Sequence, residues 1–379
     1  MPPLFAFVLA ENRQVFQPGE TISGALLLNT DKDINLRSVR VELHGLGHVR
    51  IRSGKVTYER KETYLSFQSI LLGRGPFQGG SDVKLQPGNY NFPFQFPLPP
   101  HSLPTSFEGD YGSVRYWLHA VADRPWRSNL QTHSPLFIVE RVQVNDATLL
   151  EPSMKREDRM LGWPCCPSGQ LYAKARIDRL AYCPGQEVKI SGNISNESGK
   201  QVLGTEVQLV QRVLFKAPQG TTRTCTEKVY VVKNERGLAP GEETSVEFDS
   251  FVIPSVQPTT KGFNCIEISY EIRFIVRVAK AFNTDITFPV VITTVPPSAQ
   301  PSIDPVLSQQ IYRALANYLA SRVAAELAND NAEEETEVGG QTVSDGSGAS
   351  ANGPPDVGVQ RGERPGSATG RPYHYSRMV

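Results

Sequence analysis

The stretch FQPGETISGALLLN, Phe16–Asn29, decides the fold, because a second version of it, YCPGQEVKISGNISN, occupies residues 182–196. In both versions a Pro-Gly pair predicts a turn, since proline fixes φ and glycine accepts a positive φ. A run of alternating character follows and predicts a strand with one buried face. The residues on that face are Ile22, Gly24, Leu26 and Leu28 in the first version and Val188, Ile190, Gly192 and Ile194 in the second.

The spacing of the two versions is consistent with a duplicated strand. Pro18 and Pro184 are 166 residues apart, whereas Gly24 and Gly192 are 168 apart, so the second version holds two extra residues. Side chains of a strand alternate between its faces, and an even insertion therefore keeps the inward residues inward. An odd insertion would invert the strand.

Three further elements match in the same order. SVRVELHG, residues 38–45, turns Val39, Val41 and Leu43 inward and Arg40, Glu42 and His44 outward, and TEVQLVQ, residues 205–211, repeats the pattern with Val207 and Leu209. A Pro-Gly turn, a strand and a proline-marked exit then recur, so that Pro104 and Pro258 are 154 residues apart. Tyr116 and Tyr270, in SVRYWLHA and EISYEIRF, have the same spacing. These matches indicate an internal duplication.

Each copy contains about seven short segments of strand character, separated by turns and without a helical period of useful length. This pattern predicts an all-β protein made of two tandem antiparallel, immunoglobulin-like β-sandwiches. We expect the sandwiches at residues 1–148 and 171–297, with a linker at 149–170. In the first copy Pro93, Pro97 and Pro99 alternate with apolar residues, which predicts a strand at a sheet edge or leaving the sheet, because proline cannot donate to a ladder.

The composition changes after about residue 296. Apolar residues recur at steps of four over residues 303–328, and Asp304 followed by Pro305 provides an N-cap and a first helical residue. This pattern predicts an amphipathic helix. Residues 329–379 are acidic at first and then rich in Gly, Ser and Pro, a composition typical of disorder.

Bulk properties exclude several classes of protein. The 39 basic and 39 acidic residues give a net charge of zero, so no electrostatic signal for nucleic acid exists. We interpret the N-terminus as mature protein without a signal peptide, and no apolar run is long enough to span a bilayer. Five cysteines, an odd number in a large chain, are expected to be reduced thiols in the cytoplasm.

The repeated phrases resemble the arrestin fold, and more narrowly the α-arrestins, or arrestin-domain-containing proteins. The similarity rests on the paired PGETISG and PGQEVKISG, on FPFQFPLP, LPTSFEG and GSVRYWL within residues 92–118, on AKARIDRLAYCPGQEV at 173–188 and on CCPSGQL from Cys165. The resemblance implies a non-catalytic cytoplasmic adaptor without a cofactor. It further implies binding to cytosolic segments of membrane proteins, peripheral association with the plasma membrane and endosomes, and a role in ubiquitination, endocytosis and endosomal sorting.

Two family features are missing from this sequence. Recruitment of HECT-type ubiquitin ligases in the family uses Pro-Pro-x-Tyr motifs, which bind WW domains as polyproline helices. The residues three positions after the first proline of each Pro-Pro pair are Phe5, Ser102, Ala299 and Val357. The thioredoxin-binding relative has a reactive cysteine that would align near residues 241–243, where this chain has none, so we do not predict thioredoxin binding. A retromer-like coat subunit with the arrestin fold is the alternative function.

Two segments are candidate surfaces for partners. In arrestins, basic residues of the first domain meet phosphorylated or acidic partner tails, and Arg can bind such groups bidentately. The alternative is ordinary solvated charge, and Glu59 and Glu62 dilute the basic segment. The basic candidates, within residues 48–62, are Arg50, Arg52, Lys55, Arg60 and Lys61. The Gly-rich segment 67–84, predicted as a contact loop or a plain long hairpin, adds the apolar candidates Ile70, Leu71 and Phe77.

The adjacent cysteines Cys165 and Cys166 are candidates for acylation that would hold the chain at a membrane. Unmodified linker thiols, or a zinc site completed by Cys183, are the alternatives, although adjacent cysteines lack the usual metal-ligand spacing. The six histidines show no metal-spaced pair, and no serine lies in a Gly-x-Ser-x-Gly motif. The sequence therefore predicts neither a catalytic site nor a metal site.

Overall fold

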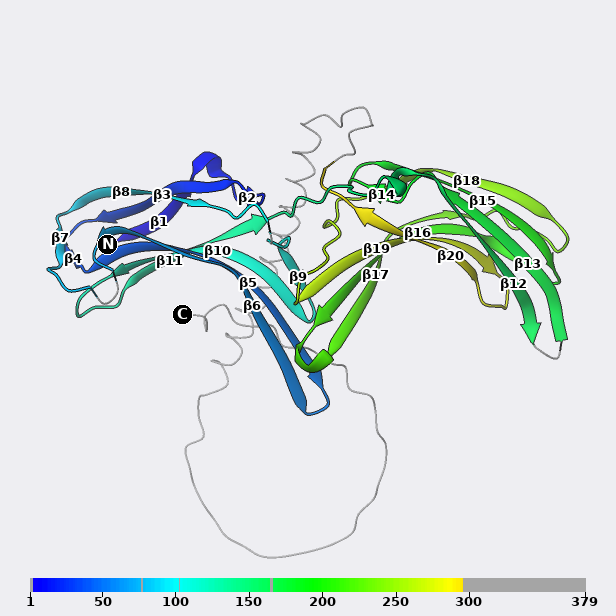
Figure 1. Cartoon of the computed structure of the whole chain (residues 1–379), viewed down its shortest axis with the longest axis horizontal. Helices are drawn as coiled ribbons and strands as arrows, with labels where there is room; N and C mark the ends of the chain where they lie inside the picture. Colours follow the sequence, from blue (N-terminus) through cyan, green and yellow to red (C-terminus); the bar gives the residue numbers. More distant parts are fainter. Residues whose placement is uncertain (1–2, 76–77, 102, 164–165, 296–379) are drawn as a thin grey trace, which may run out of the picture. The chain divides into compact units, whose positions relative to one another are not determined.

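The computed structural model describes residues 3–75, 78–101, 103–163 and 166–295 (Figure 1). The helix expected at residues 303–328 and the tail expected at 329–379 lie outside these ranges. Within them, no helix is long and apolar enough to cross a lipid bilayer. The helical segments there are short 3-10 turns: η1 Ala10–Asn12, η2 Ala147–Leu150 and η3 Pro218–Gly220.

The first sandwich is formed by two sheets, with strand orders β1-β3-β8 and β2-β11-β10-β5-β6. A short strand, β9, pairs with β10, and β4 and β7 form a small separate ladder. All pairings are antiparallel except that of β2 with β11. The strands are β1 Leu4–Leu9, β2 Val15–Phe16, β3 Thr21–Thr30, β4 Ile34–Leu36, β5 Ser38–Ser53, β6 Val56–Gly73, β7 Val83–Leu85, β8 Gly88–Pro97, β9 Phe107–Gly109, β10 Gly112–Asp123 and β11 Leu130–Ile138.

The second sandwich repeats this arrangement with the strand orders β12-β13-β15-β18 and β14-β20-β19-β16-β17. Its only parallel pairing among the described residues is that of β14 with β20. The strands are β12 Ser153–Trp163, β13 Cys166–Ile177, β14 Ala181–Tyr182, β15 Glu187–Ser198, β16 Val202–Lys216, β17 Thr222–Asn234, β18 Glu243–Val252, β19 Ile266–Val278 and β20 Thr284–Ile292. The predicted all-β tandem sandwich is therefore confirmed.

The duplication extends to individual hydrogen bonds. The turn glycines Gly19 and Gly185 have φ values of 86° and 84°. The hydroxyl of Tyr116 donates to the backbone oxygen of Pro104, and that of Tyr270 donates to the backbone oxygen of Gln257, both at 2.8 Å. Each tyrosine thus ties its strand to the segment that enters the same sheet.

The inward residues predicted from alternation form the two cores. Ile22, Leu26 and Leu28 of β3 and their counterparts Val188, Ile190 and Ile194 of β15 are all buried. The proline-containing strand β8 lies at the edge of its sheet and pairs only with β3, as its prolines predicted.

Two segments differ from the expectations. Residues 149–170, expected as a linker, instead contain η2, the strand β12 and the start of β13. The run MKREDRM in β12 has no apolar alternation, so its sequence does not predict a strand. This edge strand forms through backbone pairing with β13. Residues 67–73, predicted as the start of a contact loop or of a plain long hairpin, form the end of the strand β6, which pairs with β5 as far as Gly73.

Candidate functional site

A long hairpin of β5 and β6 presents the basic residues that the sequence singled out. Ser53 pairs with Val56 at its end, so that Gly54 and Lys55 form the tip, and Gly54 adopts a φ of 60°. Glycine suits this position because a left-handed conformation costs it no steric strain. Strand pairing therefore fixes where each basic side chain points.

Four of the five predicted basic residues belong to one surface, which we call the basic hairpin face: Arg50, Arg52, Lys55 and Lys61. Arg50 pairs with Glu59 and His48 pairs with Lys61 in register, which places Lys61 on the same face as the two arginines. Lys55 is at the exposed tip.

Arg60 does not belong to this face, contrary to the expectation. It pairs with Val49, a fully buried residue, and so lies on the opposite side of the hairpin. The sequence put Arg60 and Lys61 together as neighbours, but consecutive residues of a strand point to opposite faces.

One acidic residue lies within the basic hairpin face. Glu59 Oε1 is 2.9 Å from His48 Nε2 and 3.3 Å from Lys61 Nζ. Its carboxylate offsets part of the positive charge, so the face remains basic but is weaker than a count of its cations suggests.

The apolar candidates do not form a contact loop. Ile70 and Leu71 belong to β6, where Ile70 is 43% exposed and Leu71 packs against the core. Phe77 lies outside the described residues. Gly73 is the last residue of β6, with a φ of 78°, and a Cβ added there would lie 2.2 Å from the backbone oxygen of Arg37.

The cysteine candidates remain a prediction. Cys165 lies outside the described residues, and Cys166 is the first residue of β13. Cys183, the third ligand of the alternative zinc site, is buried, and its Sγ is 3.1 Å from Thr293 Oγ1. Burial raises the pKa of the Cys183 thiol, which disfavours the thiolate that a metal requires.

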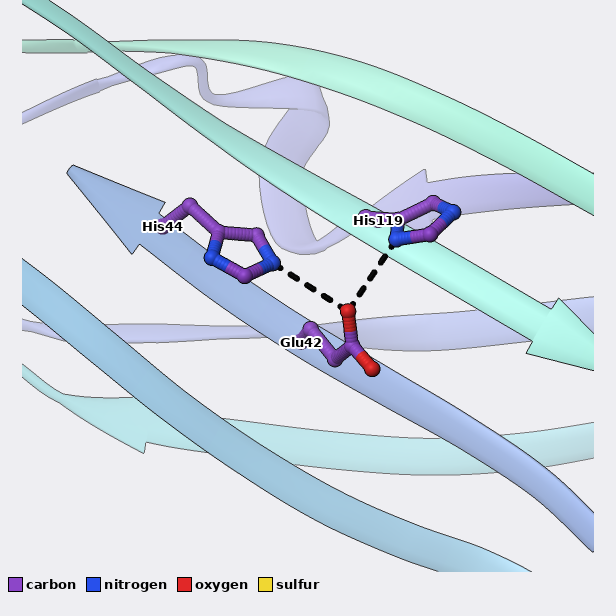
Figure 2. Close-up of side chains that lie close together, drawn as sticks. All are labelled: Glu42, His44 and His119. Carbon is purple, nitrogen blue, oxygen red and sulfur yellow. Dashed lines mark hydrogen bonds and ion pairs between the residues drawn. The ribbon is translucent and has the colours of Figure 1, made fainter. Parts of the chain in front are cut away.

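The structure also brings together a cluster that sequence reasoning missed: Glu42, His44 and His119 (Figure 2). Glu42 and His44 lie on the outward face of β5, and His119 faces Glu42 directly from β10. His44 Nε2 is 3.2 Å and His119 Nδ1 is 3.1 Å from the same oxygen, Glu42 Oε2. All three side chains are half-buried.

Neighbouring side chains hold this cluster in place. Arg40 Nε donates to the other carboxylate oxygen, Glu42 Oε1, at 2.8 Å. The rings of His44 and Trp117 stack with centroids 5.2 Å apart, and those of His119 and His133 stack at 4.3 Å. The hydrogen bond from His119, followed by those from His44 and Arg40, holds the pKa of Glu42 far below its ordinary value despite partial burial. Glu42 is therefore ionised at neutral pH.

The signal for this cluster was present in the sequence but incomplete. Alternation predicted that Glu42 and His44 share the outward face of one strand, two residues apart. That His119 lies opposite them depends on the register between β5 and β10, which joins positions 77 residues apart. Ligand spacing within one segment, the criterion applied to the histidines, cannot detect such a cross-strand set.

Comparison with known proteins agrees with this architecture. Residues 5–145 match the family model "Arrestin (or S-antigen), N-terminal domain", and residues 167–297 match "Arrestin (or S-antigen), C-terminal domain". The chain is 29% identical to arrestin domain-containing protein 4 of Homo sapiens and 30% identical to that of Mus musculus, in both cases over 76% of this chain and 70% of the relative. It is 27% identical to thioredoxin-interacting protein of Homo sapiens, over 76% of this chain and 73% of the relative. The chain therefore belongs to the α-arrestin family.

Proposed function

We propose that this arrestin-type adaptor binds cytosolic segments of membrane proteins without catalysis and influences their ubiquitination, endocytosis and endosomal sorting. The observation that supports the proposal is the basic hairpin face, carried by a rigid two-stranded extension of an arrestin sandwich. A protein that acts by binding needs such an exposed surface of defined shape and charge.

The partner chemistry follows from the charge of this face. Arg50 and Arg52 are exposed, are spaced two residues apart on one strand and point the same way. Their guanidinium groups are suited to carboxylates and phosphates, which they bind through paired hydrogen bonds. Acidic or phosphorylated segments of membrane proteins are therefore the partners that we propose.

Cys183, Cys225 and Cys265 give no support for a reaction of a thiol with thioredoxin, the protein that the name of one relative mentions. Reaction at sulfur requires a thiolate. Burial raises the pKa of Cys183 and Cys225, and raises that of Cys265 to about 12. We therefore do not extend that relative's interaction to this chain.

Proximity labelling in cells tests the proposal with three full-length chains. The first is the wild type, and the second carries Arg50→Glu, Arg52→Glu and Lys55→Glu. The matched control carries Arg223→Glu, Lys228→Glu and Lys233→Glu, which reverse three exposed charges on β17, the counterpart of β6 in the second sandwich.

We expect the first triple variant to lose labelled membrane proteins that the wild type and the control retain. Labelled HECT-type ligases in all three chains would place ligase recruitment away from the hairpin. An unchanged set of labelled membrane proteins in the folded first variant would remove the hairpin from the proposal. A constant, stoichiometric set of copurifying proteins would instead indicate a coat subunit.

A further inference from the structure

Two imidazole nitrogens converge on one carboxylate oxygen in the Glu42–His44–His119 cluster, and Figure 2 shows both rings turned towards it. Ligand atoms bound to a tetrahedral zinc at its usual bond lengths lie about 3.3 Å apart. The two distances observed here are 3.2 Å and 3.1 Å, and all three ligand atoms lie within 4.8 Å of one another. Two of the three separations between ligand atoms thus already match those of a zinc site.

The donor set selects the kind of metal. Imidazole nitrogen is a good ligand for zinc and other late transition metals, whereas calcium and magnesium prefer oxygen alone. Two histidines and one glutamate make a set of three, which leaves a fourth tetrahedral position for water or for a side chain of a partner.

The surroundings favour an ordered set of ligands. Arg40 binds Glu42 Oε1 and so directs Oε2 towards the histidines, as groups that hydrogen-bond to ligands do in metal sites. The stacked rings of Trp117 and His133 restrict the rotation of His44 and His119 respectively. His119 Nε2 is buried and has no hydrogen-bond partner in the described part of the chain. His119 Nε2 has no partner whether or not it carries the ring proton. Moving the proton from Nδ1 to Nε2, which leaves Nδ1 free to bind zinc, therefore adds little free-energy cost.

We propose that Glu42 Oε2, His44 Nε2 and His119 Nδ1 bind one zinc ion. The ion occupies the space between the three atoms and replaces the hydrogen bonds that now join them. Because Glu42 and His44 belong to β5 and His119 belongs to β10, coordination fastens these two strands together across their outer face. The positive charge of Arg40 opposes a second cation nearby, so we expect a dissociation constant on the order of micromolar.

Isothermal titration with zinc chloride tests the proposal on the full-length chain without a histidine tag. All chains carry Cys165→Ser and Cys166→Ser, which removes two adjacent thiols that could bind zinc elsewhere in the chain. The test variants are His44→Gln and His119→Gln. Glutamine keeps an amide that can donate to Glu42 but is a poor zinc ligand, so a purely structural role for the histidines would survive these changes. His101→Gln is the matched control, because His101 is an exposed histidine outside the cluster.

We expect one zinc per chain in the parent and in His101→Gln, and an affinity at least tenfold weaker in His44→Gln and in His119→Gln. Zinc should also raise the thermal midpoint of the parent and the control, but not that of the two test variants. Thermal midpoints measured in EDTA show whether each variant is folded without zinc. If one test variant is unfolded, the zinc affinity of the other test variant decides the outcome.

Three results would overturn the proposal. The first is the absence of saturable binding below about 1 mM zinc in the parent. The second is equal affinity in all four chains, which would place the ion elsewhere. The third is a loss in His101→Gln as large as that in His119→Gln, which would show that the ligand set is not the one assigned here.

Discussion

The two sandwiches share a frame but differ on their outer faces. His119 and Arg273 are 154 residues apart, like Tyr116 and Tyr270, and occupy the same place in β10 and β19. Each lies at the centre of an equivalent cross-strand row. That row is His133, His119 and Glu42 in the first sandwich and Thr287, Arg273 and Gln208 in the second.

The chemistry of the two rows is different although their geometry is the same. In the first sandwich, two imidazoles meet one carboxylate. In the second, Arg273 pairs with Glu271 on its own strand at 2.7 Å, and the residue in the place of His44 is Val210. Inward positions must fill a shared core, whereas outward positions are free of that constraint. The two halves therefore differ in chemistry on their outer faces, and the second sandwich is an internal control for the zinc proposal.

Additions to the frame also separate the halves. Only the first sandwich has β9 and the β4–β7 ladder among the described residues, and only the second has β12. Each addition lies at an edge or beside the main sheets. The shared strand arrangement thus accommodates extra strands at its edges. Substitutions at duplicated interior positions test whether the two sandwiches lose the same amount of stability.

The largest loss of unfolding free energy is expected from substitution of the duplicated glycines, Gly24 and Gly192. A Cβ added at Gly192 would lie 2.2 Å from the ring of Phe274, which is fully buried and packs against Phe248. Gly192→Ala should lower the free energy of unfolding by about 3 kcal/mol, because the ring has no space to move.

Gly24→Ala should cost less, about 1–2 kcal/mol. Its Cβ would lie 2.6 Å from the backbone oxygen of Val8, in the edge strand β1, which can shift outward. Urea denaturation measures both, with Gly79→Ala as the control because nothing lies within 4 Å of its Cβ. Equal losses at Gly24 and Gly192 would show that the two cores are packed alike, contrary to this comparison.

Substitution of the duplicated tyrosines, Tyr116 and Tyr270, should give the next largest loss of unfolding free energy. Tyr270→Phe should destabilise by about 2 kcal/mol, because it leaves the backbone oxygen of Gln257 without this donor and removes the nearer of the two acceptors of Gln211 Nε2, 2.6 Å away. Tyr116→Phe leaves only the Pro104 oxygen without its donor, and about 1 kcal/mol is expected.

Thermal and urea denaturation of the two Phe variants measure this difference. The double variant provides a check, since the two sites share no partner and their effects should add. A larger loss for Tyr116→Phe than for Tyr270→Phe would contradict the ranking.

A pH-dependent effect is expected where the duplicated positions hold different groups, Glu140 and Thr294. Burial raises the pKa of Glu140 to about 7 from its ordinary value of 4.5, and a hydrogen bond with Thr260 opposes this only in part. The folded chain therefore keeps a proton that the unfolded chain has already lost between these two values. Stability should fall as pH rises from about 4.5 to about 7 and level off above.

Glu140→Gln removes this titration. Relative to the variant, the wild type should lose about 1–2 kcal/mol of unfolding free energy across that pH window, less than the full shift in pKa implies because the side chain is only half-buried. Urea denaturation of both chains at a series of pH values measures the difference. A difference that is constant with pH would show that Glu140 is already ionised in the folded chain.

The sequence predicted the features that depend on local alternation. The inward residues of β3, β5, β15 and β16, the edge position of β8 and the tandem arrangement all follow from period-two patterns and from proline chemistry. These signals lie within single segments, so one sequence is enough to find them.

The features that it missed depend on pairing between segments. The strand β12 has a charged, unpatterned sequence and is specified by its neighbour β13. The place of Arg60 and the meeting of His119 with Glu42 are set by register across the sheet, including bulges near Val39 and Gly45 that no residue pattern marks. Cross-strand register is a property of the folded sheet, and candidate sites built on it need the structure.

The smallest effect on stability is expected from substitutions on β6 and β17. On β6 the substitution should change the binding of acidic partners instead. Glu59→Gln removes the acidic group from the basic hairpin face. Its exposed ion pair with Lys61 contributes at most about 1 kcal/mol, and a glutamine can still accept a hydrogen bond from the buried His48. The unfolding free energy should change little, but a fluorescent acidic peptide should bind several-fold more tightly at low salt, because a like charge no longer repels it. Glu227→Gln, an exposed glutamate on β17, makes the same change in the second sandwich and should leave binding unaltered. Equal gains for the two variants would mean that the peptide responds to net charge alone, and that the hairpin of the first sandwich has no special role.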